Sequence, residues 1–187
     1  MSRYIQRSDI VDYQTYEDIR KEVRDHILGV KKVRRIHLGH HLTFLFENRE
    51  TLTYQVQEIM RAERIARESA ILEEISGYNA MLGDQGELGC ALLIEIEHAK
   101  DRKPLLKRWL GLEATLYVRD EAGAKHYATY DPSQVGTDRI SAVQYLRFRC
   151  PAAPVAVGCD FDDDMAGEVE LTSDQRAALT LDLTAPA

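Results

Sequence analysis

Many hydrogen-bonding side chains are concentrated in one segment, between an apolar alternating stretch that ends at Phe46 and a helical pattern that begins near Asn48. Carboxylate, amide and guanidinium groups at a strand-to-helix junction could bind a polar ligand. They could instead satisfy the unpaired amides of the first helical turn, and we expect this structural role to come first. The members of this polar segment are Glu47, Asn48, Arg49, Gln55, Gln57, Glu58, Arg61 and Glu63.

Asn48 is the residue expected to cap the helix, because its side-chain oxygen can accept a hydrogen bond from an otherwise unpaired amide. The arginines of the segment are expected to neutralise its acids. We predict that Arg49 or Arg61 pairs with Glu47 or Glu58.

Glu63 raises a separate question, because helical spacing places it on the apolar stripe between Ile59 and Ala66. A buried carboxylate is costly unless it is paired, hydrogen-bonded or bound to a metal. Our first expectation is an arginine pair, and a bound metal is the second. The simpler alternative places Glu63 at the edge of the stripe, where its carboxylate reaches solvent.

Acidic and histidine side chains form a second group at the end of a predicted strand. Glu95 and Glu97 would project from one face about 7 Å apart. Two such carboxylates could hold a divalent cation or divide acid and base roles, although a solvated strand end is the favoured interpretation. No cofactor is predicted, and a divalent metal stays an open alternative. The candidate ligands are His40, His41, Glu63, Glu95, Glu97 and His98.

Several well-defined catalytic motifs are missing from the sequence. It contains no G-x-x-x-x-G-K-[ST], no G-x-G-x-x-G, no H-E-x-x-H and no G-x-S-x-G. Nucleotide-dependent, zincin and α/β-hydrolase chemistry therefore lose their usual support. Whether the protein is an enzyme stays open, and no catalytic residue is assigned.

The charge distribution disfavours nucleic acid as a partner. The chain has a net charge of −7, with 13 Lys and Arg against 10 Asp and Glu in residues 1–67, and 11 against 21 in residues 68–187. One basic cluster, residues 31–35, could contact phosphates, but an acidic protein repels a polyanion over most of its surface.

The sequence favours a cytoplasmic protein without a membrane span. No apolar run approaches the roughly 18 residues that a span requires, and the N-terminus lacks the apolar core of a secretory signal. Cys90, Cys150 and Cys159 are odd in number and show no C-x-x-C spacing, so they are expected to be reduced thiols. The oligomeric state is left open.

The predicted elements place helices before strands, which favours an α+β fold with a mostly antiparallel sheet over a doubly wound parallel one. The sheet could curl into a partial barrel, with two long helices of the N-terminal half packed on it, in a single domain over residues 1–187. The expected helices cover 12–32, 48–77 and 103–110, with a last one after Ser173. The expected strands cover 35–37, 41–47, 88–97, 113–119, 125–130, 142–149, 155–161 and 168–171.

The polar segment also carries a resemblance. The run Phe46-Glu47-Asn48-Arg49, followed by Gln55-Val56-Gln57-Glu58-Ile59-Met60, resembles an uncharacterised bacterial family known as a domain of unknown function. Genes of that family often lie beside genes for rubrerythrin-like and iron-sulfur oxidoreductase proteins. The resemblance therefore implies a setting in redox or oxidative-stress metabolism.

Two functions are compatible with these observations. The first is a non-catalytic accessory protein that binds a redox partner, either rubrerythrin-like or an iron-sulfur protein. The alternative is a metal-dependent protein or enzyme that holds iron or another divalent ion with Glu and His side chains.

Overall fold

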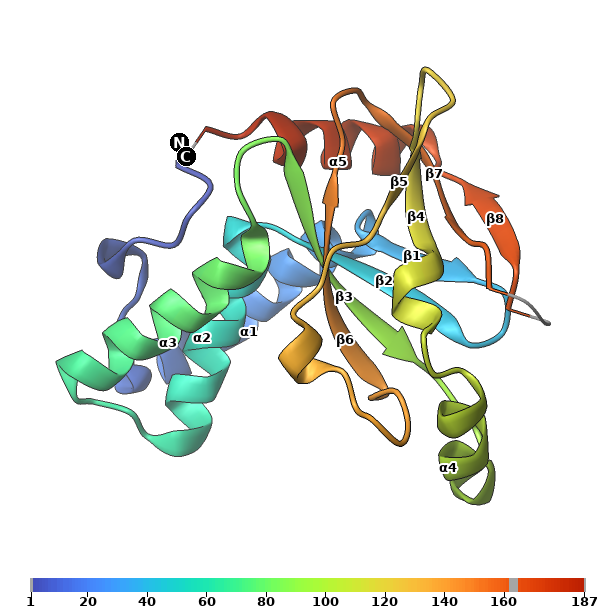
Figure 1. The fold of residues 1–187 in the computed structure, drawn as a ribbon. Coiled ribbons are helices and arrows are strands. Elements are labelled where there is room, and N and C mark those ends of the chain that lie inside the picture. Colours follow the sequence, from blue (N-terminus) through green and yellow to red (C-terminus); the bar gives the residue numbers. More distant parts are fainter. Residues whose placement is uncertain (1, 162–164, 187) are drawn as a thin grey trace.

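The computed structural model of the chain describes residues 2–161 and 165–186. Helices α1, α2 and α3 gather on one side of two β-sheets, and α5 lies along another side (Figure 1). This arrangement confirms the predicted α+β class. The α-helices are α1 (Tyr13–Lys32), α2 (Arg49–Glu63), α3 (Glu68–Leu82), α4 (Ala99–Arg108) and α5 (Ser173–Thr184), and short 3-10 helices cover Arg7–Asp9, Leu112–Thr115 and Pro132–Gln134.

The strands form two four-stranded sheets, in the orders β1-β2-β3-β6 and β5-β4-β7-β8. All of their pairings are antiparallel. Thr129 and Arg147 exchange two backbone hydrogen bonds and so join an edge of one sheet to an edge of the other. Across the described residues the strands do not close into a barrel. Their bounds are β1 (Arg35–Leu38), β2 (Leu42–Glu47), β3 (Glu87–Ile94), β4 (Leu116–Asp120), β5 (Lys125–Tyr127), β6 (Val143–Arg149), β7 (Pro154–Cys159) and β8 (Gly167–Glu170).

The main hydrophobic core draws on both sheets. Side chains alternate between the two faces of a strand, so the apolar residues of β2, β3 and β6 turn together toward those of β4 and β7. Trp109, which directly follows α4, and Leu179, in the middle of α5, contribute to the same core. Its strand members include Phe44, Phe46, Leu92, Leu146, Phe148, Leu116, Val118 and Val157.

A second, smaller core holds the N-terminal segment against α2 and α3. Its buried members are Ile5, Ile10, Leu52, Val56, Met60, Ile71, Ile75 and Leu82. The two chain ends meet beside it, where the Arg3 amide donates to the Pro186 carbonyl at 2.7 Å (Figure 1). The guanidinium of Arg3 also donates to the carbonyls of Leu82 and Glu87, at 2.9 and 2.7 Å.

The prediction of one continuous helix over 48–77 was wrong. Helix α2 ends at Glu63, and Arg64 adopts the left-handed conformation with φ 54°. The Arg64 and Ile65 amides both return to the carbonyl of Met60, which closes the helix, and α3 begins at Glu68 beside α2. Periodicity alone missed this break because no Gly or Pro marks it. The four-residue connection, residues 64–67, keeps hydrophobic positions at nearly helical spacing.

Three smaller details also differ from expectation. Pro104 lies inside α4 and does not open it. Residues 113–115, expected to begin a strand, belong instead to the 3-10 helix Leu112–Thr115 before β4. Thr172, and not Ser173, caps α5, because its side-chain oxygen accepts the Gln175 amide. Among the described residues, none of the helices combines the length and hydrophobicity needed to cross a bilayer.

The end of α3 crosses β3 in very close contact. A Cβ atom added at Gly89 would lie 2.2 Å from the Met81 carbonyl oxygen and 3.0 Å from the Leu82 Cα atom. Both neighbours are backbone atoms, which cannot rotate away as a flexible side chain could. Glycine at position 89 therefore sets how closely α3 approaches the first sheet.

Substituting Gly89→Ala is expected to lower the free energy of unfolding by about 1–3 kcal/mol, because the helix must shift away from the strand. Gly29→Ala, at an exposed position within α1 where an added Cβ meets nothing within 4 Å, is the matched control. It should leave stability unchanged or raise it by about 0.5–1 kcal/mol. Urea denaturation measures both, and equal stability of the two variants would contradict the packing argument.

The expected cap of α2 is confirmed. The Asn48 side-chain oxygen accepts the Thr51 amide at 2.9 Å, and the Thr51 hydroxyl in turn accepts the Asn48 amide at 2.9 Å. Asn48→Ala should lower the free energy of unfolding by about 0.5–2 kcal/mol in the same denaturation measurement. Asn48→Ser retains a capping oxygen and should recover much of that loss. A serine variant as unstable as the alanine variant would show that capping is not the cause.

Candidate functional site

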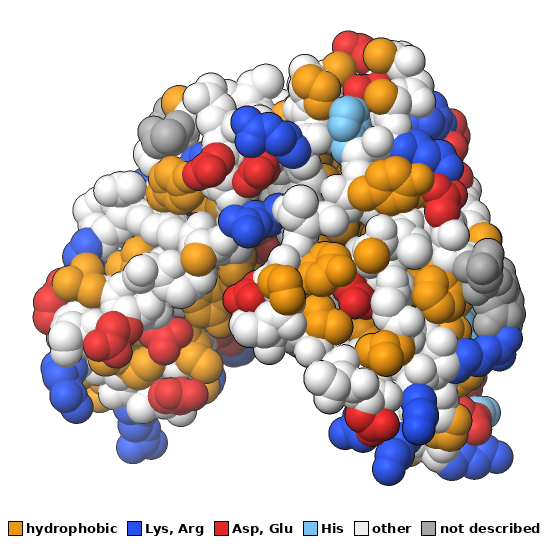
Figure 2. All heavy atoms as spheres, viewed as in Figure 1, with side chains coloured by type: hydrophobic (Ala, Val, Ile, Leu, Met, Phe, Trp, Pro, Cys, Tyr) orange, Lys and Arg blue, Asp and Glu red, His pale blue; other side chains and the backbone are white. Residues whose placement is uncertain are grey.

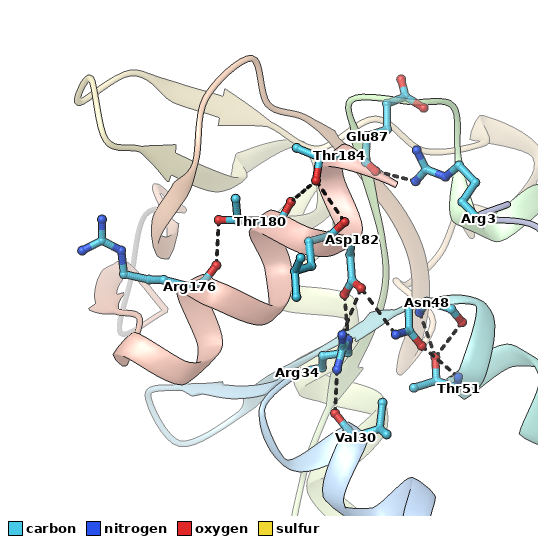
Figure 3. Close-up of polar contacts among 11 residues, drawn as sticks. Arg3, Val30, Arg34, Asn48, Thr51, Glu87, Arg176, Thr180, Asp182 and Thr184 are labelled. Carbon is cyan, nitrogen blue, oxygen red and sulfur yellow. Dashed lines mark hydrogen bonds and ion pairs between the residues drawn. The ribbon is translucent and has the colours of Figure 1, made fainter. Parts of the chain in front are cut away.

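The start of the predicted polar segment, at Asn48, lies where α2 meets α5 and the end of α1 (Figure 3). Arg34 donates to both carboxylate oxygens of Asp182, at 2.7 and 2.9 Å, and its third contact is the Val30 carbonyl at 3.0 Å. The side chains of this ion pair are only 10% and 12% exposed. Asn48 adds a long hydrogen bond, 3.4 Å, to the same carboxylate. Asn48 is therefore part of a network that fastens the C-terminal helix to the rest of the fold.

The arginines of the segment find other partners than those predicted. Arg49 pairs with Asp9, with a nitrogen-to-oxygen distance of 2.9 Å. Arg61 pairs with Glu17 of α1. The prediction that they would pair with Glu47 or Glu58 was wrong. The actual partners lie on α1 and in the N-terminal segment, which are parts of the chain that sequence spacing does not relate to α2.

Glu58 is held by α1. Arg20 donates to its two carboxylate oxygens at 2.8 and 2.9 Å, and the hydroxyl of Tyr16 donates at 2.6 Å. The hydrogen bond from Arg20 lowers the pKa of Glu58 most strongly, burial opposes it, and the hydrogen bond from Tyr16 adds to the lowering. Glu58 is therefore kept ionised as the acceptor that joins α1 to α2.

The two glutamines of the segment differ in environment. Gln57 is buried and brackets the backbone of Val11, accepting its amide at 2.8 Å and donating to its carbonyl at 3.2 Å. Gln55 is half-buried. Gln57 therefore acts as a structural link to the N-terminal segment.

Glu47 is the acid of this polar segment that is buried, which the sequence did not indicate. It is 8% exposed, and burial raises the pKa of its carboxyl despite the favourable effects of Thr51, Lys31 and Arg34. With Asn48 and Arg49 it lines a small cavity of about 190 Å³.

Glu63 is exposed at the end of α2, so the expectation of a buried, partnered carboxylate was wrong for both the arginine and the metal versions. The buried face of α2 contains Val56 and Met60, whereas Ile59 is half-buried and Ala66 is exposed. The simpler alternative, a solvent-exposed carboxylate, holds.

The metal candidates are only partly brought together. His40, Glu95 and Glu97 line a shallow hollow beyond the end of β3, and both glutamates are exposed. The Thr43 hydroxyl donates to the Glu95 carboxylate at 2.7 Å, and His41 contacts the Glu95 carbonyl at 2.9 Å through Nδ1. Over residues 2–161 and 165–186, no three His, Cys, Asp or Glu side chains converge as metal ligands would. His98 directly precedes α4 and is exposed.

A groove that the sequence did not predict runs between α3 and β6, with a volume of about 420 Å³. Figure 2 shows a hollow between the helices α1, α2 and α3 on one side and the sheets on the other, with hydrophobic side chains beside acidic ones. Tyr145 is 46% exposed on its wall, a high value for a large aromatic side chain. The lining residues are Glu74, Gly77, Tyr78, Ala80, Met81, Tyr130, Asp131, Tyr145, Leu146 and Arg147.

Three segments far apart in sequence build this groove. Glu74 and Tyr78 are four residues apart on α3 and so share one face of the helix. Tyr145 lies on β6, whose burial alternates along its whole length and leaves the outer face free. Tyr130 and Asp131 follow directly after Thr129, which the backbone bridge holds beside β6.

The groove has its own electrostatic character. Burial raises the pKa of Tyr78, and the nearby charge of Glu74 raises it further. Hydrogen bonds from Ser133 lower the pKa of Asp131, and the charge of Arg147 contributes. Sequence reasoning missed these residues because no short motif joins them. The available signals were the exposed tyrosine in an alternating strand and the Glu74–Tyr78 spacing.

Glu58→Gln tests the junction through its pH dependence. The folded-state pKa of Glu58 is depressed, so its contribution to stability is present above the ordinary glutamate pKa of about 4.3 and is lost as pH falls through the folded value. The variant should be less stable than wild type at pH 7, and the difference should shrink below about pH 4. Urea denaturation at pH 7, 5 and 3 measures it, and a difference that grows toward acid would contradict the assignment.

Comparison with known proteins gives the chain a family without an activity. A crystal structure of a novel protein of unknown function from Burkholderia pseudomallei is similar to it, with 27% sequence identity and a TM-score of 0.87, over 96% of this chain and 98% of that one. No curated protein matches it. A family model described as "Protein of unknown function (DUF3501)" matches residues 4–183. Because the match spans nearly the whole sequence, the chain belongs to this family of unknown function.

Proposed function

We propose that this protein is a non-catalytic accessory protein that binds another protein through the groove between α3 and β6. The observation that carries the proposal is the groove itself, an open hollow of about 420 Å³ with three tyrosines in its lining. Tyrosine presents a large apolar ring and a polar hydroxyl at a low cost in side-chain entropy, and it is enriched among residues that dominate protein interfaces.

The surroundings of the groove support a protein partner further. Tyr145 and Val143, on the same outer face of β6, are 46% and 41% exposed, so apolar surface continues from the groove along the strand. Contiguous apolar surface of this kind, beside charged residues, is typical of interaction sites.

The proposed setting is redox or oxidative-stress metabolism, with a rubrerythrin-like or iron-sulfur protein as the partner. Its support is the resemblance of the polar segment to a family whose genes lie beside genes for such proteins. The metal-dependent alternative stays a prediction, and His40, Glu95 and Glu97 are the residues that a metal would have to draw together.

Isothermal titration of the purified chain with each of these two candidate partner proteins tests the proposal. We expect one of them to bind with a micromolar or lower Kd. Tyr78→Ala and Tyr145→Ala should each weaken binding by roughly tenfold or more. Tyr127→Ala is the matched control, because Tyr127 on β5 is 48% exposed but lies outside the groove lining.

Two results would contradict the proposal. One is the absence of binding to both candidate proteins. The other is equal weakening by the groove variants and by Tyr127→Ala, which would place the interface elsewhere.

A further inference from the structure

The groove combines aromatic rings with a carboxylate that lacks a partner. Glu74 is half-buried on α3, and among the described residues it has no hydrogen bond or ion pair. Tyr78 lies one helical turn farther along the same face, and its pKa responds to the charge of Glu74 as well as to Tyr145 on the opposite wall. An acid and tyrosine rings therefore face one space.

The basic residue of the groove does not neutralise this acid. Arg147 stands near Asp131, whose pKa its charge helps to lower, and the stem of Arg147 lies against the turn at Gly83. The unpaired charge of the groove lining is therefore negative, and it lies on Glu74. The wider surface reinforces it, because residues 68–187 carry 11 Lys and Arg against 21 Asp and Glu.

From this arrangement we infer that the groove receives a basic side chain, a lysine or an arginine, from the docking segment of the protein partner. The inference rests on the proposed function and specifies the chemistry of the partner. The cation contacts the carboxylate of Glu74 and the faces of Tyr78 and Tyr145.

The physical basis is the attraction between a cation and the negative face of an aromatic ring, which adds to the charge-assisted hydrogen bond with a carboxylate. Half-buried surroundings strengthen both interactions relative to a fully exposed pair. Arginine also stacks its planar group on tyrosine rings. An acidic or neutral side chain would leave Glu74 unpaired or repelled.

The test uses two small probes that differ in charge and hardly in shape, Nα-acetyl-arginine amide and its neutral analogue Nα-acetyl-citrulline amide. Each is titrated into the full chain and followed by NMR chemical shifts of the Tyr78 and Tyr145 amides. The arginine probe should bind weakly, with a roughly millimolar Kd, and roughly fivefold more tightly than the citrulline probe.

Variants assign the effect to residues. Glu74→Gln should bring the two probes within about twofold of each other, and Tyr145→Leu should weaken the arginine probe by roughly threefold or more. Glu73→Gln makes the same charge change at an exposed neighbour outside the groove lining and should retain the full preference. Tyr127→Leu is the corresponding control for the aromatic ring.

Three outcomes would overturn the inference. The probes could bind equally, the preference could survive in Glu74→Gln, or the groove could be closed by a second copy of the chain. The last outcome would appear as self-association in sedimentation velocity, with arginine-probe binding that weakens as protein concentration rises.

The two hypotheses can fail separately. If a redox partner binds through Tyr78 and Tyr145 while the arginine probe shows no preference, the proposed function stands and the basic side chain is rejected. If the arginine probe behaves as expected but neither candidate protein binds, the cation site stands and the named partners are rejected.

Discussion

The ion pair between Arg34 and Asp182 joins segments that are 148 residues apart, and the position of α5 against the end of α1 and the start of α2 depends on it. Both side chains are nearly buried, so each charge needs the other, and loss of one partner from such a pair costs about 3–5 kcal/mol. The carbonyl of Val30 and the amide of Asn48 satisfy further hydrogen-bonding capacity of the two groups. Geometry of this kind fixes one arrangement of the helices more strictly than apolar contacts alone.

The close approach of α3 to β3 determines where the groove between α3 and β6 lies. Because Gly89 lets the end of α3 contact the backbone of β3, it fixes the distance of Tyr78 and Glu74 from the outer face of the first sheet. The opposite wall is set independently by the alternation of β6. The groove is therefore the space left between a helix and a sheet that touch at one end only.

Local rules predicted much of the fold. Alternation, helical spacing and the hydrogen-bonding capacity of one side chain predicted a strand over 41–47, a helix over 12–32 and a cap at Asn48. The structure has the strand over 42–47, the helix over 13–32 and the cap at Asn48. The turn between α2 and α3 was missed, because a left-handed arginine carries no composition signal. The missed turn also explains the error at Glu63, since a helix that stops there leaves its last side chain in solvent.

Pairing across long distances was beyond local reasoning. The partners of Arg49, Arg61 and Glu58 lie on α1 or in the N-terminal segment, and their choice depends on how helices pack. The groove was missed for the same reason, because its residues come from α3, β6 and the segment after β5. A single sequence gives the type of each element but not which side chains meet.

The bridge between Thr129 and Arg147 connects the two sheets directly beside the groove. Tyr130 follows the bridge directly, lines the groove and packs at the same time against the main core. An occupant that contacts both Tyr130 and Tyr145 thus touches the chain on both sides of this junction. By thermodynamic linkage, any difference in its affinity for two relative placements of the sheets shifts the population between them by the same factor.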